Sequence, residues 1–360
     1  MYHSKVLLLL LILLALNACT SKRTPPEHAF YYWKSDYDLI YDTYPSGDPQ
    51  DSLRKVLDVS HVYLHLFDVD WSENLSMPIP KAEFRGAYEI SQFIRSGYTP
   101  VVFITNRTFE RIADSSCAQL ARRVADKINK LNSNLSDTAS GQAHPVPPPE
   151  TKQREIQIDC DWTAGTREKY FHFLKEIRKL FPDYALSATI RLYPYKYPDK
   201  TGVPPVDRGM LMCYNLGNIK DASTINSVFD VNTLKQYLSG GDYPLPLDIA
   251  FPVFGWYAWF RGNEFKGIVH DGPEFIEDTS SFAALDKQRY RIKTDTVLGD
   301  NYYRAGDILR REYPDTATLQ TAITLVEEKI PDYKRIAFYH WHQSSIMTYE
   351  KVIKTAFAGR

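Results

Sequence analysis

The stretch Ile156-Gln157-Ile158-Asp159-Cys160-Asp161-Trp162-Thr163 alternates apolar and polar side chains, as a buried strand does. A period of two places Asp159 and Asp161 on the inner side of a barrel, with the apolar set facing the helices. Two carboxylates about 7 Å apart on one face are costly to bury unless they are hydrogen-bonded or functional. Like charges this close raise at least one pKa, as a proton-transferring acid needs. We expect Asp159 and Asp161 to be catalytic; a helix-capping or solvated pair is the alternative.

Strands of this kind recur along the chain. Runs rich in Val, Ile, Tyr and Phe alternate with amphipathic stretches, which indicates βα units and a parallel sheet. The predicted strands cover 29–33, 62–67, 100–105, 155–161, 186–193, 210–214, 248–254 and 335–341. The predicted helices cover 81–95, 116–131, 166–181, 316–330 and the tail from 349. The fold class is therefore α/β, a (β/α)8 TIM barrel, in which reacting groups sit at the C-terminal strand ends.

The chain has 360 residues, whereas about 250 suffice for such a barrel. Part of the excess is the stretch 138–151, a loop rich in Pro, Ser and Gly. The rest is an insertion at 262–316, after the seventh strand, which has strand-like pieces of its own. We expect a barrel over 28–360 whose insertion overhangs the C-terminal face; a separate domain is the alternative.

The N-terminal segment has the features of a targeting signal. Lys5 precedes an apolar run at 6–16, which is too short to span a bilayer but suits a signal peptide. The following Leu16-Asn17-Ala18-Cys19 resembles a bacterial lipobox, which implies cleavage before Cys19 and its lipidation. We expect a signal peptide at 1–18 and a tether at 19–27. We expect the lipid on Cys19 to anchor the protein in the bacterial cell envelope, with the outer membrane as the preferred location. An ordinary signal peptide with a chance Cys is the alternative.

Composition excludes several partners. The chain has 43 basic and 44 acidic residues, a net charge of -1, so nothing favours nucleic acid or a polybasic membrane surface. Three cysteines remain besides Cys19, none at zinc-binding spacing, and we expect no metal and no cofactor. Cys160 and Cys213 fall on the outward sides of strands about 10 Å apart, too far for a disulfide. We expect a monomer.

Four motifs occur in order on the second half of the barrel. Asp159 and Asp161 lie on the fourth strand, and the sixth reads Met212-Cys213-Tyr214-Asn215. The seventh reads Ala250-Phe251-Pro252-Val253-Phe254-Gly255, and the eighth ends at Trp341. These strands resemble DxxDxDxE, MxYD, GIPFYG and an inward Trp of the family-18 glycoside hydrolases, the chitinase-like barrels. The resemblance implies that Asp161 orients a substrate acetamido group and that Tyr214 is its hydrogen-bonding partner.

The departures from that family concern the proton donor. Ile156 replaces the first Asp of the motif, and Thr163 stands where the family has its catalytic Glu. The SxGG of the third strand is absent as well; Ile104-Thr105-Asn106-Arg107 stands there. A hydroxyl does not protonate a glycosidic oxygen at neutral pH. The proton would come from Asp68, Asp70, Asp161 or Glu264, or else hydrolysis has been lost.

All six tryptophans fall at predicted C-terminal strand ends, where they suit a sugar-stacking cleft better than random core filling does. Arg191 either binds a carboxylate or steadies Asp159. The predicted substrate-binding residues are Trp33, Asp68, Asp70, Trp162, Arg191, Tyr193, Asn215, Trp256 and Trp341. We expect a membrane-anchored, glycoside-hydrolase-like protein acting on or binding an oligosaccharide or polysaccharide, with N-acetylamino sugars as the class the resemblance suggests. A catalytically inactive glycan-binding lipoprotein on the same barrel is the alternative.

Overall fold

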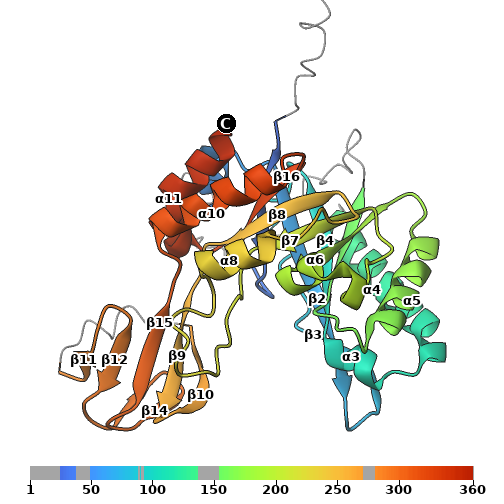
Figure 1. Ribbon diagram of the computed structural model, residues 1–360. Coiled ribbons are helices and arrows are strands. Elements are labelled where there is room, and N and C mark those ends of the chain that lie inside the picture. The colour runs from blue at the N-terminus through green and yellow to red at the C-terminus, as the bar shows by residue number, and fades with distance from the viewer. Residues whose placement is uncertain are drawn as a thin grey trace, which may run out of the picture.

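A computed structural model describes residues 25–37, 49–87, 90, 93–136, 154–270 and 280–359 (Figure 1). Eight parallel strands follow one another around a closed barrel in the order β1, β16, β8, β7, β6, β5, β4 and β2, and β2 pairs with β1. Their bounds are β1 Glu27–Tyr32, β2 His61–Ser72, β4 Tyr98–Ile104, β5 Glu155–Asp159, β6 Ala185–Arg191, β7 Arg208–Met212, β8 Leu247–Pro252 and β16 Arg335–Tyr339. The predicted (β/α)8 fold class is confirmed.

Helices cover the outside of this barrel (Figure 1). They are α2 Pro49–Val56, α3 Asn106–Arg111, the 3-10 turn η2 Asp114–Ser116, α4 Cys117–Ser136, α5 Arg167–Leu180, α6 Leu192–Lys196, α7 Pro198–Thr201, α8 Val231–Leu238, α10 Thr316–Lys329 and α11 Gln343–Ala358. The face of α5 that meets the barrel carries Tyr170, Phe173, Leu174 and Ile177, all fully buried. These four residues share one face at the 3.6-residue helical period, so the sequence pattern predicts the contact.

Several predicted elements differ from the structure in their bounds. The strand expected at 62–67 is the longer β2, whose outer part pairs with β3 Met77–Lys81 as an antiparallel hairpin. The helix expected over 81–95 was therefore placed too early, although helical hydrogen bonds join Ile90 to Gly86 and Ile94 to Ile90. The fifth predicted strand ends at Arg191, because α6 begins at the next residue.

The insertion after β8 forms a lobe of its own (Figure 1). Its five-stranded antiparallel sheet consists of β9 Trp256–Arg261, β10 Glu264–Val269, β11 Phe282–Ala284, β12 Arg289–Ile292 and β15 Ile308–Glu312. A separate hairpin joins β13 Thr296–Leu298 to β14 Asn301–Tyr303. The sheet thus starts six residues before the expected 262. A small core of Tyr257, Val269, Phe282, Ile292, Tyr303 and Leu309 holds the lobe together.

Several expectations concern residues outside the described ranges: the signal peptide at 1–18, the lipidated Cys19, most of the tether, and the loop at 138–151. None of the helices in the described part of the chain combines the length and apolar composition that crossing a bilayer requires. Cys117, Cys160 and Cys213 are buried and free, so the prediction that Cys160 and Cys213 are not bridged is confirmed.

Candidate functional site

Asp159 ends β5 with its side chain inside the barrel, as the alternation predicts. Its Oδ1 accepts a hydrogen bond of 2.5 Å from the hydroxyl of Thr189 on the adjacent β6. Burial and, to a smaller extent, the negative charge of Asp161 raise the pKa of Asp159 to about 7. A carboxyl group with this pKa is protonated in a large fraction of molecules at neutral pH, so it can give or take a proton.

Asp161 lies at the rim and is ion-paired. Its side chain is 52% exposed, and Oδ1 lies 3.2 Å from Nη1 of Arg191. The other guanidinium nitrogen of Arg191 donates to the backbone oxygen of Asn215 at 3.3 Å. Of the two expected roles for Arg191, the structure places its ion pair on Asp161 rather than on Asp159. This contact joins the ends of β5 and β6 to the loop after β7.

Asn215 adds an unsatisfied acceptor beside this pair. Its backbone has a φ of 55°, a left-handed conformation that Asn tolerates better than most residues do. Within the described residues, its buried Oδ1 has no hydrogen-bond partner. A buried polar atom without a partner is costly in the free protein, and a bound hydroxyl or amide would satisfy it.

Aromatic rings fill the centre of the barrel below these groups. Tyr339 of β16 stacks on Tyr214, with ring centroids 5.3 Å apart, and contacts Tyr31 at 5.7 Å and Trp33 at 5.4 Å. Burial raises the pKa of Tyr31, Tyr214 and Tyr339, so all three hydroxyls stay protonated. The Tyr214 hydroxyl donates to the sulfur of Met212, not to Asp161. The floor of the site is therefore aromatic and neutral.

Asp68 forms a second acidic position on β2. Its Oδ1 lies 2.7 Å from Nε2 of the buried His65, whose ring packs against Trp33. Asp68 lies opposite Phe103 of β4, which in turn lies opposite Asp159 of β5, so the two aspartates occupy the same level of the barrel. Asp159, Asp161 and Asp68 thus surround the aromatic floor.

The chain was compared with family models, with curated proteins and with solved structures, and only the solved structures gave matches. No family model matches the chain, and no curated protein matches its sequence. The spore cortex-lytic enzyme SleL of Bacillus megaterium QM B1551 is 13% identical over 92% of this chain and 75% of its own, with a TM-score of 0.50. Other neighbours are the GH18 chitinase of Cycas revoluta in complex with (GlcNAc)3 (12% identity, 92% and 99% coverage, TM-score 0.49) and YKL-39, solved with chitooligosaccharides (9% identity, 93% and 100% coverage, TM-score 0.49). The neighbours in fold are chitinase-like barrels. At these identities the likeness concerns the fold alone.

Thr163, which the sequence resemblance matches to a Glu, lies in a hydrogen-bonded turn. The backbone nitrogen of Thr163 donates to Thr166 Oγ1 at 2.9 Å, and Thr166 in turn donates to Asn106 at 2.6 Å. These contacts make the turn that leads into α5. Thr163 therefore shapes the start of this helix and brings no carboxyl group to the site.

Two of the expected alternative acids do not fit that role. Asp70 accepts hydrogen bonds from Lys81 at 2.7 Å and Thr105 at 2.8 Å, and the bond from Lys81 lowers its pKa. Asp70 therefore stays ionised at neutral pH. Glu264 lies opposite Arg261 at the tip of the β9–β10 hairpin, the end that is remote from the barrel. Of the expected acids, Asp68 and Asp161 remain, and the pKa of about 7 adds Asp159 as a third candidate.

Two predicted sugar-stacking tryptophans lie behind the barrel wall. Trp162 is 4% exposed, and its Nε1 donates to the backbone oxygen of Thr201. Trp341 is 1% exposed and packs edge-on against Phe30 and Phe93. Neither ring faces the barrel interior, so the predicted role of both was wrong. Tyr339 is the inward aromatic residue of β16.

The other predicted binding residues divide between rim and lobe. Trp33 is half-buried on the ring of His65, whereas Tyr193 is 47% exposed on α6 beside Tyr197. The strand predicted at 186–193 would have included Tyr193, but β6 ends two residues before it. Trp256 is the first residue of β9 in the lobe, and its Nε1 donates a hydrogen bond of 3.0 Å to Glu312.

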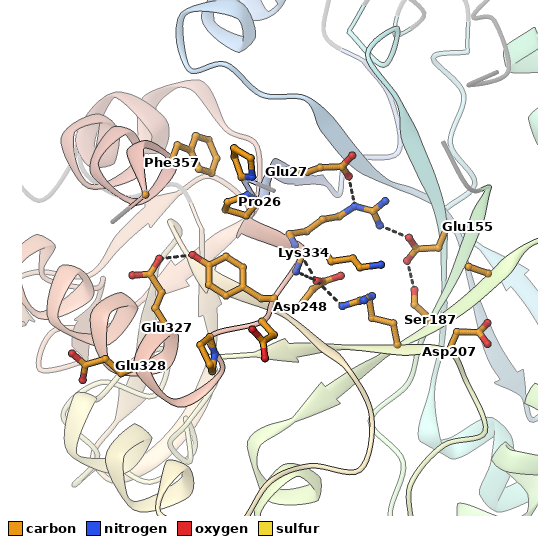
Figure 2. Close-up of a pocket in the computed structure, with 18 of the residues that line it drawn as sticks. Pro26, Glu27, Glu155, Ser187, Asp207, Asp248, Glu327, Glu328, Lys334 and Phe357 are labelled. Carbon is orange, nitrogen blue, oxygen red and sulfur yellow. Dashed lines mark hydrogen bonds and ion pairs between the residues drawn. The ribbon is translucent and has the colours of Figure 1, made fainter. Parts of the chain in front are cut away.

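A large cavity lies at the opposite end of the barrel from Asp159 and Asp161 (Figure 2). It has a volume of about 1100 Å3 and is lined by residues at the N-terminal strand ends. Arg335 is one of the lining residues and is ion-paired with Glu27 and Glu155, both labelled in Figure 2. These charges are paired with one another, which fits a structural role for this end of the barrel.

Asp159→Asn is expected to make the protein more stable than the wild type above neutral pH. Because burial and Asp161 raise the folded-state pKa of Asp159 from 3.8 to about 7, the contribution of its protonated form is fully present below pH 4. It is lost as pH rises through 7. Chemical denaturation should show a gain at pH 8 that exceeds the gain at pH 5 by on the order of 2–3 kcal/mol. Equal gains at both values would contradict the raised pKa.

Proposed function

We propose that this chain is a lipid-anchored protein of the bacterial cell envelope that binds an amino-sugar glycan at the carboxyl ends of its barrel strands. One observation carries the proposal: the ion pair of Asp161 with Arg191 and the carboxyl of Asp159, whose pKa is about 7, lie above a floor of tyrosines. Sugars present apolar C–H faces together with hydroxyl and amide groups, so they suit an aromatic floor rimmed by polar side chains.

Solved neighbours support the choice of ligand. The Cycas revoluta chitinase and YKL-39 were both solved with chitooligosaccharides. Asn215 supplies an acceptor for an amide or hydroxyl of such a ligand, since its buried Oδ1 lacks a partner within the described residues. Asp161, next to Asn215 through Arg191, supplies a charged acceptor.

Hydrolysis is a second candidate function, favoured by the raised pKa of Asp159. The pKa of Asp159, at about 7, suits a proton donor at neutral pH. Binding without cleavage ranks first, because Thr163 gives the site no carboxyl group where chitinase-like barrels place their acid.

The proposed anchor agrees with the direction of the chain. β1 begins at Glu27 at the N-terminal end of the barrel, whereas Asp159 and Asp161 lie at the other end. A tether attached through Cys19 would hold the glycan-binding end away from the membrane. Release of Cys19→Ser into the soluble fraction of expressing cells tests this part, and unchanged membrane association would contradict it.

Asp161→Asn is expected to weaken binding of chitotetraose roughly tenfold or more, because a hydrogen bond to a charged acceptor is lost. Isothermal titration calorimetry measures the affinity. Cellotetraose, which has no acetamido groups, is the comparison ligand that shows how much those groups contribute to binding. Asp183→Asn, an exposed carboxylate elsewhere on the barrel, is the matched control and should bind as the wild type does. Reducing-end release from the same oligosaccharide reports cleavage. If the wild type neither binds nor cleaves chitotetraose, the proposal fails.

A further inference from the structure

Three side chains with metal-binding chemistry converge on the outer wall of the barrel. Asp114 lies in η2, Cys117 is the first residue of α4, and His172 lies in the second turn of α5. Their ligand atoms, a carboxylate oxygen, the thiol sulfur and a ring nitrogen, all lie within 4.8 Å of one another. This is the one such group in the described ranges, and it is separate from the site at the strand ends.

We propose that Asp114, Cys117 and His172 bind a zinc ion. A thiolate, an imidazole and a carboxylate are the three ligand types that zinc takes in proteins, whereas magnesium and calcium prefer oxygen alone. Tetrahedral zinc with its usual bond lengths holds ligand atoms about 3.3–3.8 Å apart. The 67% exposed side chain of Asp114 and the 37% exposed one of His172 are free to close the remaining distance. A water molecule or an external ligand would take the fourth position.

The orientation of His172 supports the site independently. Its Nδ1 lies 3.2 Å from Asp114 Oδ1, and its Nε2 faces Glu176 Oε1, one helical turn further along, at 3.9 Å. A ring nitrogen that binds zinc usually has a carboxylate or carbonyl beside the other nitrogen, which fixes the ring and strengthens the ligand. Glu176 is the carboxylate on that side of the ring, and its Oε1 also accepts a hydrogen bond of 2.5 Å from Lys179.

The state of Cys117 is compatible with this role. It is free rather than in a disulfide, and its sulfur lies 4.0 Å from the backbone oxygen of Ala113, so it has only a weak contact to give up. Zinc would join η2 and the start of α4 to α5. Because these elements are far apart in sequence, the ion would add a cross-link that the unfolded chain lacks.

The test is metal binding by the whole chain, with zinc and cobalt as probes. Titration calorimetry against a competing chelator should give one zinc per chain, and zinc should raise the melting temperature. The cobalt complex should show a thiolate-to-metal charge-transfer band in the near ultraviolet. Cys117→Ser should abolish this band, and His172→Gln should weaken zinc binding roughly tenfold or more.

The control is His28→Gln, which removes a histidine paired with a carboxylate, Asp58, but without a thiol. This variant should keep full zinc affinity and the cobalt band. The half-exposed position of His172 means that His172→Gln should fold even if Cys117→Ser does not, and circular dichroism checks both. Absence of stoichiometric zinc binding, a cobalt complex without the thiolate band, or unchanged affinity in His172→Gln would each overturn the proposal.

Discussion

Replacing Arg335 with methionine is expected to lower the free energy of unfolding by about 3–5 kcal/mol. The side chain of Arg335 is 13% exposed inside the N-terminal end of the barrel, ion-paired with Glu27 and Glu155, and it donates to the hydroxyl of Tyr63. Glu155 is 8% exposed. Without the guanidinium, a buried carboxylate would be left with only the hydroxyl of Ser187 to stabilise its charge. Chemical denaturation at neutral pH measures the loss.

The matched control for this prediction is Arg289→Met. Arg289 pairs with Asp286 in the lobe, but these side chains are 56% and 40% exposed, so the pair should contribute less than about 1 kcal/mol. The double variant Arg335→Met/Glu155→Gln should recover part of the loss, because it no longer buries an unpaired charge. If the two arginine variants were equally destabilised, the buried pairing would not be the source of stability.

The barrel could be predicted from sequence because each strand carries its own local signal. The alternation from Ile156 to Asp161 gives both the strand and the side that faces inward, and Thr189 and Arg191 meet the two aspartates as that parity requires. The apolar face of α5 follows from helical spacing in the same way. Such signals depend on a few neighbouring residues, so no alignment or long-range contact is needed to find them.

The errors occurred where the period of two was applied inconsistently or carried past a strand end. Trp162 shares the parity of Ile158 and Cys160, so the rule that placed Asp161 inside also places Trp162 outside. β16 ends at Tyr339. The resemblance assigned the inward position to Trp341, two residues beyond the end of this strand, but the ring packs behind the barrel. The same alternation, stopped at the strand end, would have found Tyr339.

Other features depend on pairing between distant segments and have no local signal. The Asp161–Arg191 ion pair follows from the register of β5 on β6, in which Gln157 lies opposite Ser187. Cys117 and His172 meet only because η2, α4 and α5 lie together on the barrel wall. Scanning the sequence for ligands at zinc spacing does not find such a group, because the spacing rules describe local motifs.

The buried Glu312 joins the lobe to the barrel, and Glu312→Gln is expected to cost about 3–5 kcal/mol of unfolding free energy. Glu312 is fully buried, pairs with Arg310 (3% exposed), and accepts hydrogen bonds from Ser227 and from Trp256 Nε1. Glutamine keeps the shape and some hydrogen bonds but removes the charge, leaving the guanidinium of Arg310 buried without a counter-ion. Thermal and chemical denaturation measure the effect.

This substitution should also loosen the segment that carries Asn215. Ser227 lies in the loop between β7 and α8, and Arg310 donates to two backbone oxygens of the same loop, those of Ile219 at 3.0 Å and Asp221 at 2.8 Å. Amide hydrogen exchange should therefore accelerate across 215–230 in Glu312→Gln, and the weaker positioning of Asn215 should lower affinity for chitotetraose. Glu264→Gln, which breaks an exposed pair with Lys266 in the same lobe, should change neither. If loop exchange in Glu312→Gln matched that of Glu264→Gln, the lobe would not be what holds this side of the site in place.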